Sequence, residues 1–190
     1  MAHKLDTILE AAEILRNHPN IRFLMAGDGS ERQRLQAIKM ERQLDNIIML
    51  DQLPKHQMPK LWQLVDASLV LLKRCDLFKT VIPSKIFESM AMSKPIVLGV
   101  EGEVAEIIEQ SRSGICIEPE NAVQLAKAVL DLHDNTNPEF GQNGLEFVTR
   151  EFDRQELALQ FLCILERVNS NSGTPFSGTS TFPSTKARSI

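Results

Sequence analysis

The chain has 190 residues, of which 43% are hydrophobic and 24% charged, and its formal net charge is −4. This composition is typical of one soluble globular domain, and the acidic balance argues against general nucleic-acid binding, which needs a basic surface. No apolar run reaches the roughly 18 residues of a membrane-spanning helix, and the amphipathic, acid-bearing start at residues 1–10 is unlike a signal peptide.

The cysteines and histidines do not predict a metal site. Cys75, Cys116 and Cys163 are far apart and lie among apolar neighbours, which favours buried free thiols in a reducing cytoplasm. The four histidines show no ligand spacing with the cysteines or with acidic residues. We therefore expect a cytoplasmic protein that binds no metal.

Helical and extended patterns alternate along most of the chain. In chain order we expect a helix over 4–17, a strand over 21–26, a helix over 30–43, a strand over 47–50, a helix over 56–65, a strand over 67–72, a helix over 83–92, a strand over 95–98, a helix over 103–109 and a strand over 115–117. Short, nearly continuous apolar strands between helices are typical of a parallel sheet covered on both faces. The predicted fold class is therefore α/β, doubly wound, with ligands bound outside the carboxyl ends of the strands.

The C-terminal part is predicted to be helical and then disordered. Asn121 and Asp153 each begin a pattern that resembles a helix capping box. From residue 169 the chain is dominated by Ser, Thr, Gly and Pro, with too few apolar residues to offset the entropy of ordering. We expect a domain over residues 1–168 and a disordered tail over residues 169–190.

The segment over residues 80–92 has the most informative polar pattern. A helix is predicted to begin at Pro83, because proline is favoured in a first helical turn. Two sets of side chains then lie on opposite faces of this helix: Ile86, Phe87, Met90 and Ala91 on one, and Ser84, Lys85, Glu88 and Ser89 on the other. We expect the first face to be buried and the second to be exposed.

Ser84, Lys85 and Glu88 together suit a nucleotide. The unpaired N–H groups at the start of a helix favour a phosphate, and Lys85 adds a full positive charge. Glu88 lies one turn further on, where its carboxylate can accept two hydrogen bonds from the diol of a ribose. The alternative interpretation is an ordinary surface ion pair between Lys85 and Glu88.

A second candidate contact is the turn Gly27-Asp28-Gly29, which follows a predicted strand and precedes a helix. Glycine lets the backbone approach a ligand closely. The turn is shorter than the dinucleotide-binding fingerprint. A tight strand-to-helix turn with Ser30 as the N-cap residue remains the alternative.

Taken together, several segments resemble the C-terminal domain of retaining GT-B glycosyltransferases of family 4, also called group 1, over roughly residues 4–166. The segments that carry the resemblance are Phe23-Leu24-Met25-Ala26-Gly27-Asp28-Gly29, Met49-Leu50-Asp51-Gln52-Leu53-Pro54, Val65-Asp66-Ala67-Ser68-Leu69, Pro83-Ser84-Lys85-Ile86-Phe87-Glu88-Ser89-Met90-Ala91, Lys94-Pro95-Ile96-Val97 and Ser113-Gly114-Ile115-Cys116-Ile117. The Pro-Ser-Lys-Ile-Phe-Glu variant is similar to the branch that adds N-acetylated aminosugars in capsule and O-antigen synthesis.

The resemblance implies roles for the residues of this helix and the preceding loop. Glu88 matches the second glutamate of the family's E-x7-E motif, which holds the ribose of the nucleotide-sugar donor. Thr80 stands where the first glutamate usually contacts the donor sugar, which implies a different or weaker sugar contact. Ser84 and Lys85, after Pro83, match positions beside the diphosphate.

The resemblance also implies contacts from two other loops. Gly27 and Gly29, on either side of Asp28, match the glycine loop near the diphosphate. Leu53 matches a loop position whose backbone meets the base. The implied ligand is a nucleotide sugar, in particular a UDP-N-acetylaminosugar, with no separate cofactor, no metal and no catalytic residue in this chain.

Two parts of the family's structure are expected to be absent. One is the N-terminal domain that binds the acceptor, through which any peripheral membrane association would occur. The other is the first strand of the C-terminal domain, which is the central strand in a 3-2-1-4-5-6 sheet. We therefore expect a donor-binding half that is inactive alone. The alternatives are a truncated, non-catalytic binding or interaction module, or part of a GT-B sugar-nucleotide epimerase.

Overall fold

The structure is a computed structural model that describes residues 4–135 and 138–171, and its chain divides after Glu151 into two compact units. The first unit contains both sheets and the helices that cover them. In the second unit, the described part consists mainly of helix α8 (Arg154–Asn171). The predicted tail therefore falls largely outside the described residues, and the predicted domain limit at residue 168 stays a prediction.

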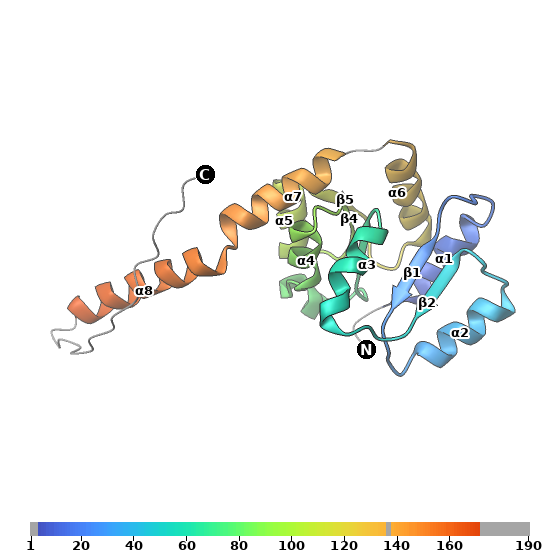
Figure 1. The fold of residues 1–190 in the computed structure, drawn as a ribbon, viewed down its shortest axis with the longest axis horizontal. Helices are drawn as coiled ribbons and strands as arrows, with labels where there is room; N and C mark the ends of the chain where they lie inside the picture. Colours follow the sequence, from blue (N-terminus) through green and yellow to red (C-terminus); the bar gives the residue numbers. More distant parts are fainter. Residues whose placement is uncertain (1–3, 136–137, 172–190) are drawn as a thin grey trace. The chain divides into compact units, whose positions relative to one another are not determined.

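Strands and helices alternate through the first unit, as the sequence predicts (Figure 1). The order is α1 (Asp6–Ile14), β1 (Phe23–Ala26), α2 (Arg32–Glu41), β2 (Ile47–Leu50), the short 3-10 helix η1 (Lys55–Gln57), α3 (Met58–Leu64), β3 (Ser68–Leu71), the 3-10 helix η2 (Asp76–Thr80), α4 (Lys85–Ala91), β4 (Ile96–Gly99), α5 (Glu103–Ser111), β5 (Gly114–Cys116), α6 (Ala122–Asp134) and α7 (Pro138–Glu151). Because Asn121 caps α6 by accepting a hydrogen bond from the Gln124 N–H at 3.0 Å, the predicted start of that helix is correct.

The strands form two parallel sheets, one of β1 and β2 and one in the order β3-β4-β5. Short parallel strands joined by helices confirm the predicted doubly wound α/β fold. Within the described residues, no strand pairs with the free edge of β1 or of β3. This break lies where the sequence resemblance predicts that the central strand is absent.

The free edge of β1 can be assigned residue by residue. The amides of Phe23 and Gly27 donate to the carbonyls of Asn46 and Leu50, at 2.8 and 3.3 Å, so these residues face β2. Because backbone groups alternate along a strand, the N–H groups of Leu24 and Ala26 point away from β2.

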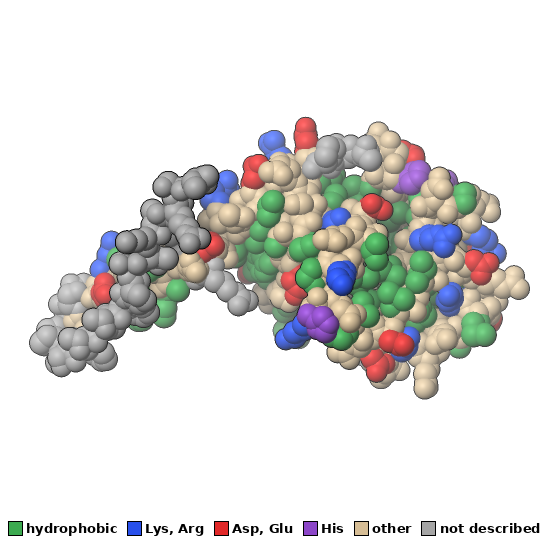
Figure 2. All heavy atoms as spheres, in the orientation of Figure 1, with side chains coloured by type: hydrophobic (Ala, Val, Ile, Leu, Met, Phe, Trp, Pro, Cys, Tyr) green, Lys and Arg blue, Asp and Glu red, His purple; other side chains and the backbone are tan. Residues whose placement is uncertain are grey.

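Burial differs between the two sheets. Every residue of β4 is buried, whereas β1 and β2 are mostly half-buried. Helix α3 has no buried residue. Apolar side chains gather on the face of the molecule beside α3, β1 and β2 (Figure 2). The sheet of β1 and β2 is therefore less well covered than the sheet that contains β4.

Two apolar cores hold the first unit together. One core joins the two sheets on a single face, because it includes side chains of α1 and α6, Phe23 and Ile47 of the first sheet, and Leu71 and Val97 of the second. The other core packs α4 and α5 against the opposite face of β3 and β4. Both faces of the second sheet are thus covered, as its nearly continuous apolar strands predict.

Helix α4 differs from its predicted pattern at two positions. Ser89, expected to be exposed, is buried, and Ala91, expected to be buried, is exposed. The Ser89 hydroxyl donates to the carbonyl of Lys85 at 2.7 Å and lies 2.8 Å from Ser68 Oγ. These contacts satisfy a small polar side chain in the interior, which its polarity alone does not reveal.

Helix α7 packs closely against α4, a contact the sequence did not predict. A side chain at Gly141 would overlap the carbonyl of Ser93, directly after α4, and one at Gly144 would lie 3.2 Å from Met90 Cγ. Glycine is therefore required at position 141, and a side chain at position 144 would be tightly packed. Across the described ranges of the chain, no helix is both long and apolar enough to cross a bilayer.

Candidate functional site

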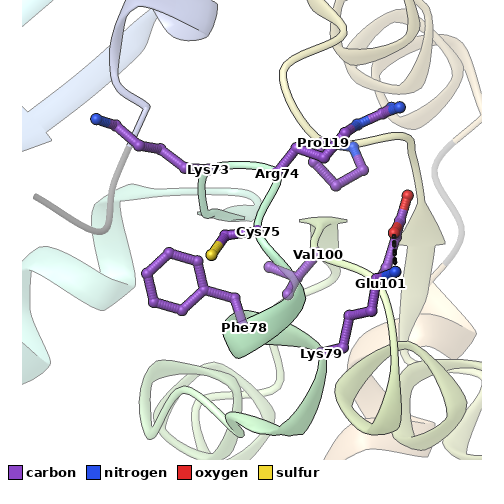
Figure 3. A pocket seen from close by; sticks show the side chains of 8 residues that line it. All are labelled: Lys73, Arg74, Cys75, Phe78, Lys79, Val100, Glu101 and Pro119. Atoms are coloured by element: carbon purple, nitrogen blue, oxygen red, sulfur yellow. Dashed lines mark ion pairs between the residues drawn. The ribbon is translucent and has the colours of Figure 1, made fainter.

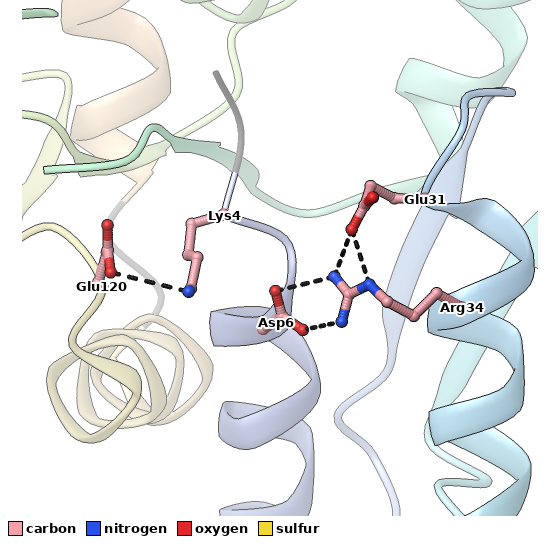
Figure 4. Close-up of polar contacts among 5 residues, drawn as sticks. All are labelled: Lys4, Asp6, Glu31, Arg34 and Glu120. Carbon is pink, nitrogen blue, oxygen red and sulfur yellow. Dashed lines mark hydrogen bonds and ion pairs between the residues drawn. The ribbon is translucent and has the colours of Figure 1, made fainter. Parts of the chain in front are cut away.

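The start of α1 connects loops at the carboxyl ends of both sheets. Lys4 Nζ lies 4.0 Å from the carboxylate of Glu120, in the loop after β5. Asp6 accepts two hydrogen bonds from Arg34 of α2, at 2.6 and 3.0 Å, and Arg34 also pairs with Glu31 (Figure 4). These contacts place the loops after β1 and β5 at the same edge, where ligands bind in doubly wound sheets.

The predicted nucleotide group lies at the start of α4. Ser84 is the N-cap residue and makes no side-chain capping bond, and Ser84, Lys85 and Glu88 are all exposed. Ion pairs at i, i+3 occur at Asp76–Lys79 and Glu31–Arg34, but within the described residues Lys85 and Glu88 form none. The interpretation as a simple surface ion pair is therefore not supported, and both charges are available to a ligand.

Two further predicted residues border this group. Thr80 ends η2 and is exposed, and its hydroxyl donates to the carbonyl of Leu77 at 3.3 Å. Pro83 is half-buried and lies directly before the N-cap residue. A contact between Thr80 and a donor sugar stays a prediction.

The predicted glycine loop lies at the carboxyl end of β1. Gly27 has φ of +139°, a conformation that favours glycine, and a Cβ at Gly27 or Gly29 would meet open space. The carboxylate of Asp28 accepts a hydrogen bond from the Gly29 N–H at 2.8 Å. Leu53 lies half-buried in the loop after β2. Open space beside both glycines leaves the backbone accessible to a ligand.

Arg32, which the sequence interpretation missed, ties these two loops together. Its guanidinium donates to the carbonyls of Gly27 and Leu50, both at 2.7 Å, and to the carboxylate of Asp51 at 2.6 Å. A basic residue in the first turn of a helix, where acids are favoured, was the available signal. Two of its partners, Leu50 and Asp51, could not be inferred because they lie at the end of a different strand, 18 and 19 residues away.

A shallow cavity of about 10 Å³ lies at the carboxyl ends of β3, β4 and β5. Lys73, Arg74, Cys75, Phe78, Lys79, Val100, Glu101 and Pro119 line it. Figure 3 shows the side chains of Lys73 and Arg74 pointing away from each other. The cavity is smaller than the range of about 300–1,000 Å³ that is usual for small-molecule sites.

Carboxylates already neutralise much of the positive charge around this cavity. Lys79 Nζ lies 2.8 Å from Asp76 and 3.7 Å from Glu101. The hydrogen bond and charge of Asp76, followed by the charge of Glu101, raise the pKa of Lys79. Arg74 lies 3.6 Å from the carboxylate of Glu118. The small volume of this cavity and its balanced charge do not favour it as a nucleotide site.

The structure brings the predicted residues to one edge in two separate groups. Thr80, Pro83, Ser84, Lys85 and Glu88 lie around the start of α4, and Gly27, Asp28, Gly29 and Leu53 lie in the loops after β1 and β2. Among the residues that the structure describes, no hydrogen bond or ion pair joins the two groups. A ligand long enough to contact both, such as a nucleotide sugar, would have to bridge them.

The cysteines correct one expectation. All three thiols are free, but Cys75 and Cys163 are exposed and Cys116 is half-buried. The expectation of buried thiols was wrong for the first two, because apolar neighbours in sequence need not surround a side chain in space. In the described parts of the chain, no group of three or more His, Cys, Asp and Glu side chains could hold a metal ion.

The sequence pattern of the family described as "Glycosyl transferases group 1" matches residues 2–146. The chain belongs to this family. The Escherichia coli K12 protein named as a colanic acid biosynthesis glycosyl transferase, WcaI, is 27% identical to it over 161 residues, which cover 83% of this chain and 39% of WcaI. The chain thus spans well under half the length of that relative.

Solved structures agree with the family on the fold. The C-terminal domain of a group 1 glycosyl transferase family protein, LpcC, from Francisella tularensis matches with a TM-score of 0.63 and 21% identity, over 78% of each chain. Anabaena Alr3699/HepE, in complex with UDP and glucose, matches with a TM-score of 0.70 and 18% identity, over 85% of this chain and 44% of that one. The fold is therefore that of a GT-B C-terminal domain.

Proposed function

We propose that the chain binds the nucleotide-sugar donor of a glycosyltransferase, in the manner of the C-terminal half of a family 4 enzyme. The observation that carries the proposal is the unpaired state of Lys85 and Glu88. Both are exposed in the first turn of α4, which follows β3 and η2 in the chain. A cation and a carboxylate one helical turn apart, neither neutralised by the protein, suit a diphosphate and a ribose diol.

Each group of the site has a role in this mechanism. Lys85 stabilises the negative charge that builds up on the leaving diphosphate, and Ser84 adds a hydroxyl donor beside it. Because α4 has only seven residues, its dipole is a minor part of this stabilisation. Glu88 accepts hydrogen bonds from the ribose.

The loops after β1 and β2 complete the proposed site. The accessible backbone at Gly27 and Gly29 approaches the diphosphate, with Asp28 holding the turn. The loop at Leu53 meets the base. Catalysis would then depend on positioning and electrostatics, without a metal held by this chain.

The similar proteins support a narrower proposal for the donor and the pathway. The solved structure of HepE holds UDP, which supports a uridine nucleotide, and WcaI is named for colanic acid biosynthesis, which supports transfer to a surface polysaccharide or a lipid-linked precursor. We propose a UDP-N-acetylaminosugar as the donor and the cytoplasm as the location. The acceptor would be bound by a separate N-terminal domain.

Titration calorimetry with UDP tests the donor site. We expect Glu88→Ala to weaken UDP binding about tenfold, because hydrogen bonds to a charged group contribute roughly 1.5–3 kcal/mol. Glu106→Ala is the matched control, since Glu106 is an exposed acid in the first turn of α5. Equal UDP affinities for the two variants, or no binding of UDP by the unmodified chain, would contradict the proposal.

A further inference from the structure

Arg32, in the first turn of α2, forms hydrogen bonds that connect the ends of two strands. Arg32 Nη1 donates to the carbonyls of Gly27 and Leu50, at 2.7 Å each, and Nη2 donates to Asp51 Oδ1 at 2.6 Å. Gly27 directly follows β1, and Leu50 is the last residue of β2. One guanidinium therefore fixes the ends of both strands of the first sheet.

The surroundings of Arg32 indicate a specific role. Its side chain is only 23% exposed, whereas that of Asp51 is 91% exposed. A cation in the first turn of a helix is opposed by the helix dipole, so its position has an electrostatic cost. A planar group with five donors can hold two carbonyls and a carboxylate at once, which a lysine ammonium cannot do with the same geometry.

The hydrogen bonds of Arg32 connect the two loops of the proposed donor site. Gly27 begins the loop Gly27-Asp28-Gly29, and Asp51 begins the loop that contains Leu53. Glycine at positions 27 and 29 imposes little conformational restriction of its own. The distance between the two loops therefore depends on β1–β2 pairing and on the three bonds of Arg32.

We propose that Arg32 is a positioning residue that sets the two loops in register, so that the diphosphate and the base of one nucleotide are held together. This proposal rests on the proposed function. Arg32 acts through the loops, since three of its five N–H donors are bound to Gly27, Leu50 and Asp51. Its effect is to make base recognition depend on the position of the glycine loop.

A comparison of two ligands tests this role. Arg32→Lys keeps the charge but loses the fork, so we expect its affinity for UDP to fall about tenfold and its affinity for inorganic pyrophosphate to stay within about twofold, because Lys85 is unchanged. The matched control is Arg34→Lys, two residues further along α2, whose partners Asp6 and Glu31 lie outside both the Gly27-Asp28-Gly29 turn and the loop that contains Leu53. We expect it to change neither affinity.

The outcomes separate positioning from simple stabilisation. Equal weakening of UDP and pyrophosphate, or no change in either, overturns the proposal for Arg32. If Arg32→Lys does not fold, Asp51→Asn removes the ion pair and leaves both carbonyl bonds. We then expect a loss of about threefold in UDP affinity alone, and an unchanged affinity overturns the proposal.

Amide NMR spectra keep this test distinct from that of the proposed function. If the unmodified chain binds neither UDP nor pyrophosphate, the proposed donor site is wrong. The connection that Arg32 makes between the two loops can still be measured. Arg32→Lys should shift the amide signals of Gly27 and Gly29 together with those of Gln52 and Leu53. Shifts confined to one loop, or absent from both, overturn the positioning role.

Discussion

At the scale of single residues, helical spacing in the sequence and contacts in the structure identified different residues of the candidate site. Lys85 and Glu88 were found from helical spacing, and the structure leaves both exposed. Arg32 was missed because its partners Leu50 and Asp51 lie 18 and 19 residues away in the sequence. Sequence spacing thus identified groups on one helix, and only the fold revealed a contact between two strand ends.

Gly102 is another residue whose importance only the structure shows. It precedes α5 with φ of +89°, and a Cβ there would overlap the backbone of Lys79 in η2. We expect Gly102→Ala to lower the free energy of unfolding by about 2 kcal/mol or more, because it adds backbone strain to a steric overlap. Urea denaturation measures this change.

Gly29→Ala is the control for Gly102→Ala. A Cβ at Gly29 meets no atom within 4 Å, so we expect its effect on the free energy of unfolding to stay within about 1 kcal/mol. If both variants unfold at the same urea concentration, the contact between Gly102 and η2 has no structural importance.

At the scale of helices and strands, apolar periodicity predicted most elements correctly. The strands at residues 23–26, 47–50 and 96–99 fall within or beside the predicted ranges. The close packing of α7 on α4 was not foreseen, because Gly141 and Gly144 are unfavourable in an isolated helix and become useful only against a neighbour. Ser89 was misplaced for a similar reason, since its partner Ser68 belongs to another element.

The contact between α1 and α2 gives a prediction about acid stability. The hydrogen bonds and charge of Arg34 hold the pKa of Asp6 below its usual 3.8. A carboxyl with a lowered pKa in the folded state stabilises the fold above about pH 3.8, and this stabilisation is lost as the pH falls through the lower folded-state value. We expect Asp6→Asn to lower stability by up to about 1 kcal/mol at neutral pH and by less at about pH 3.

Urea denaturation over this pH range measures the effect of Asp6. Asp45→Asn serves as the control, since Asp45 is exposed and forms no ion pair in the described part of the chain. We expect the difference between the two variants to shrink as the pH falls. A difference that is constant with pH would show that the Asp6–Arg34 contact does not contribute to acid stability.

At the scale of the whole molecule, two features stand out: the packing that holds the two sheets together and the exposed apolar side chains of α8. The edges of β1 and β3 have no strand neighbour in the described residues, yet one core joins the two sheets. Shared side-chain packing therefore holds them together in place of a continuous ladder of hydrogen bonds. Helix α8 belongs to the second unit, and many of its apolar side chains are exposed.

The apolar surface of α8 predicts self-association. Phe161 and Leu165 lie one turn apart and are 62% and 49% exposed, and contiguous exposed apolar side chains favour association. We expect sedimentation velocity to show concentration-dependent association of the chain, and the double substitution Phe161→Lys and Leu165→Lys to weaken it about tenfold or more. Met40→Lys, at an apolar position of α2 that is 71% exposed, is the control. Equal association of both variants would exclude α8 as the contact.

The sequence by itself determined the α/β class, the order of elements and the polar group at the start of α4. These features depend on periodicity, helix start signals and short-range spacing, which the local chain encodes. The tertiary structure alone decided that Lys85 and Glu88 remain unpaired, that Ser89 is buried and that Arg32 joins the ends of β1 and β2. Each of these depends on which side chains meet in space, and partners from distant elements leave no periodic signal along the chain.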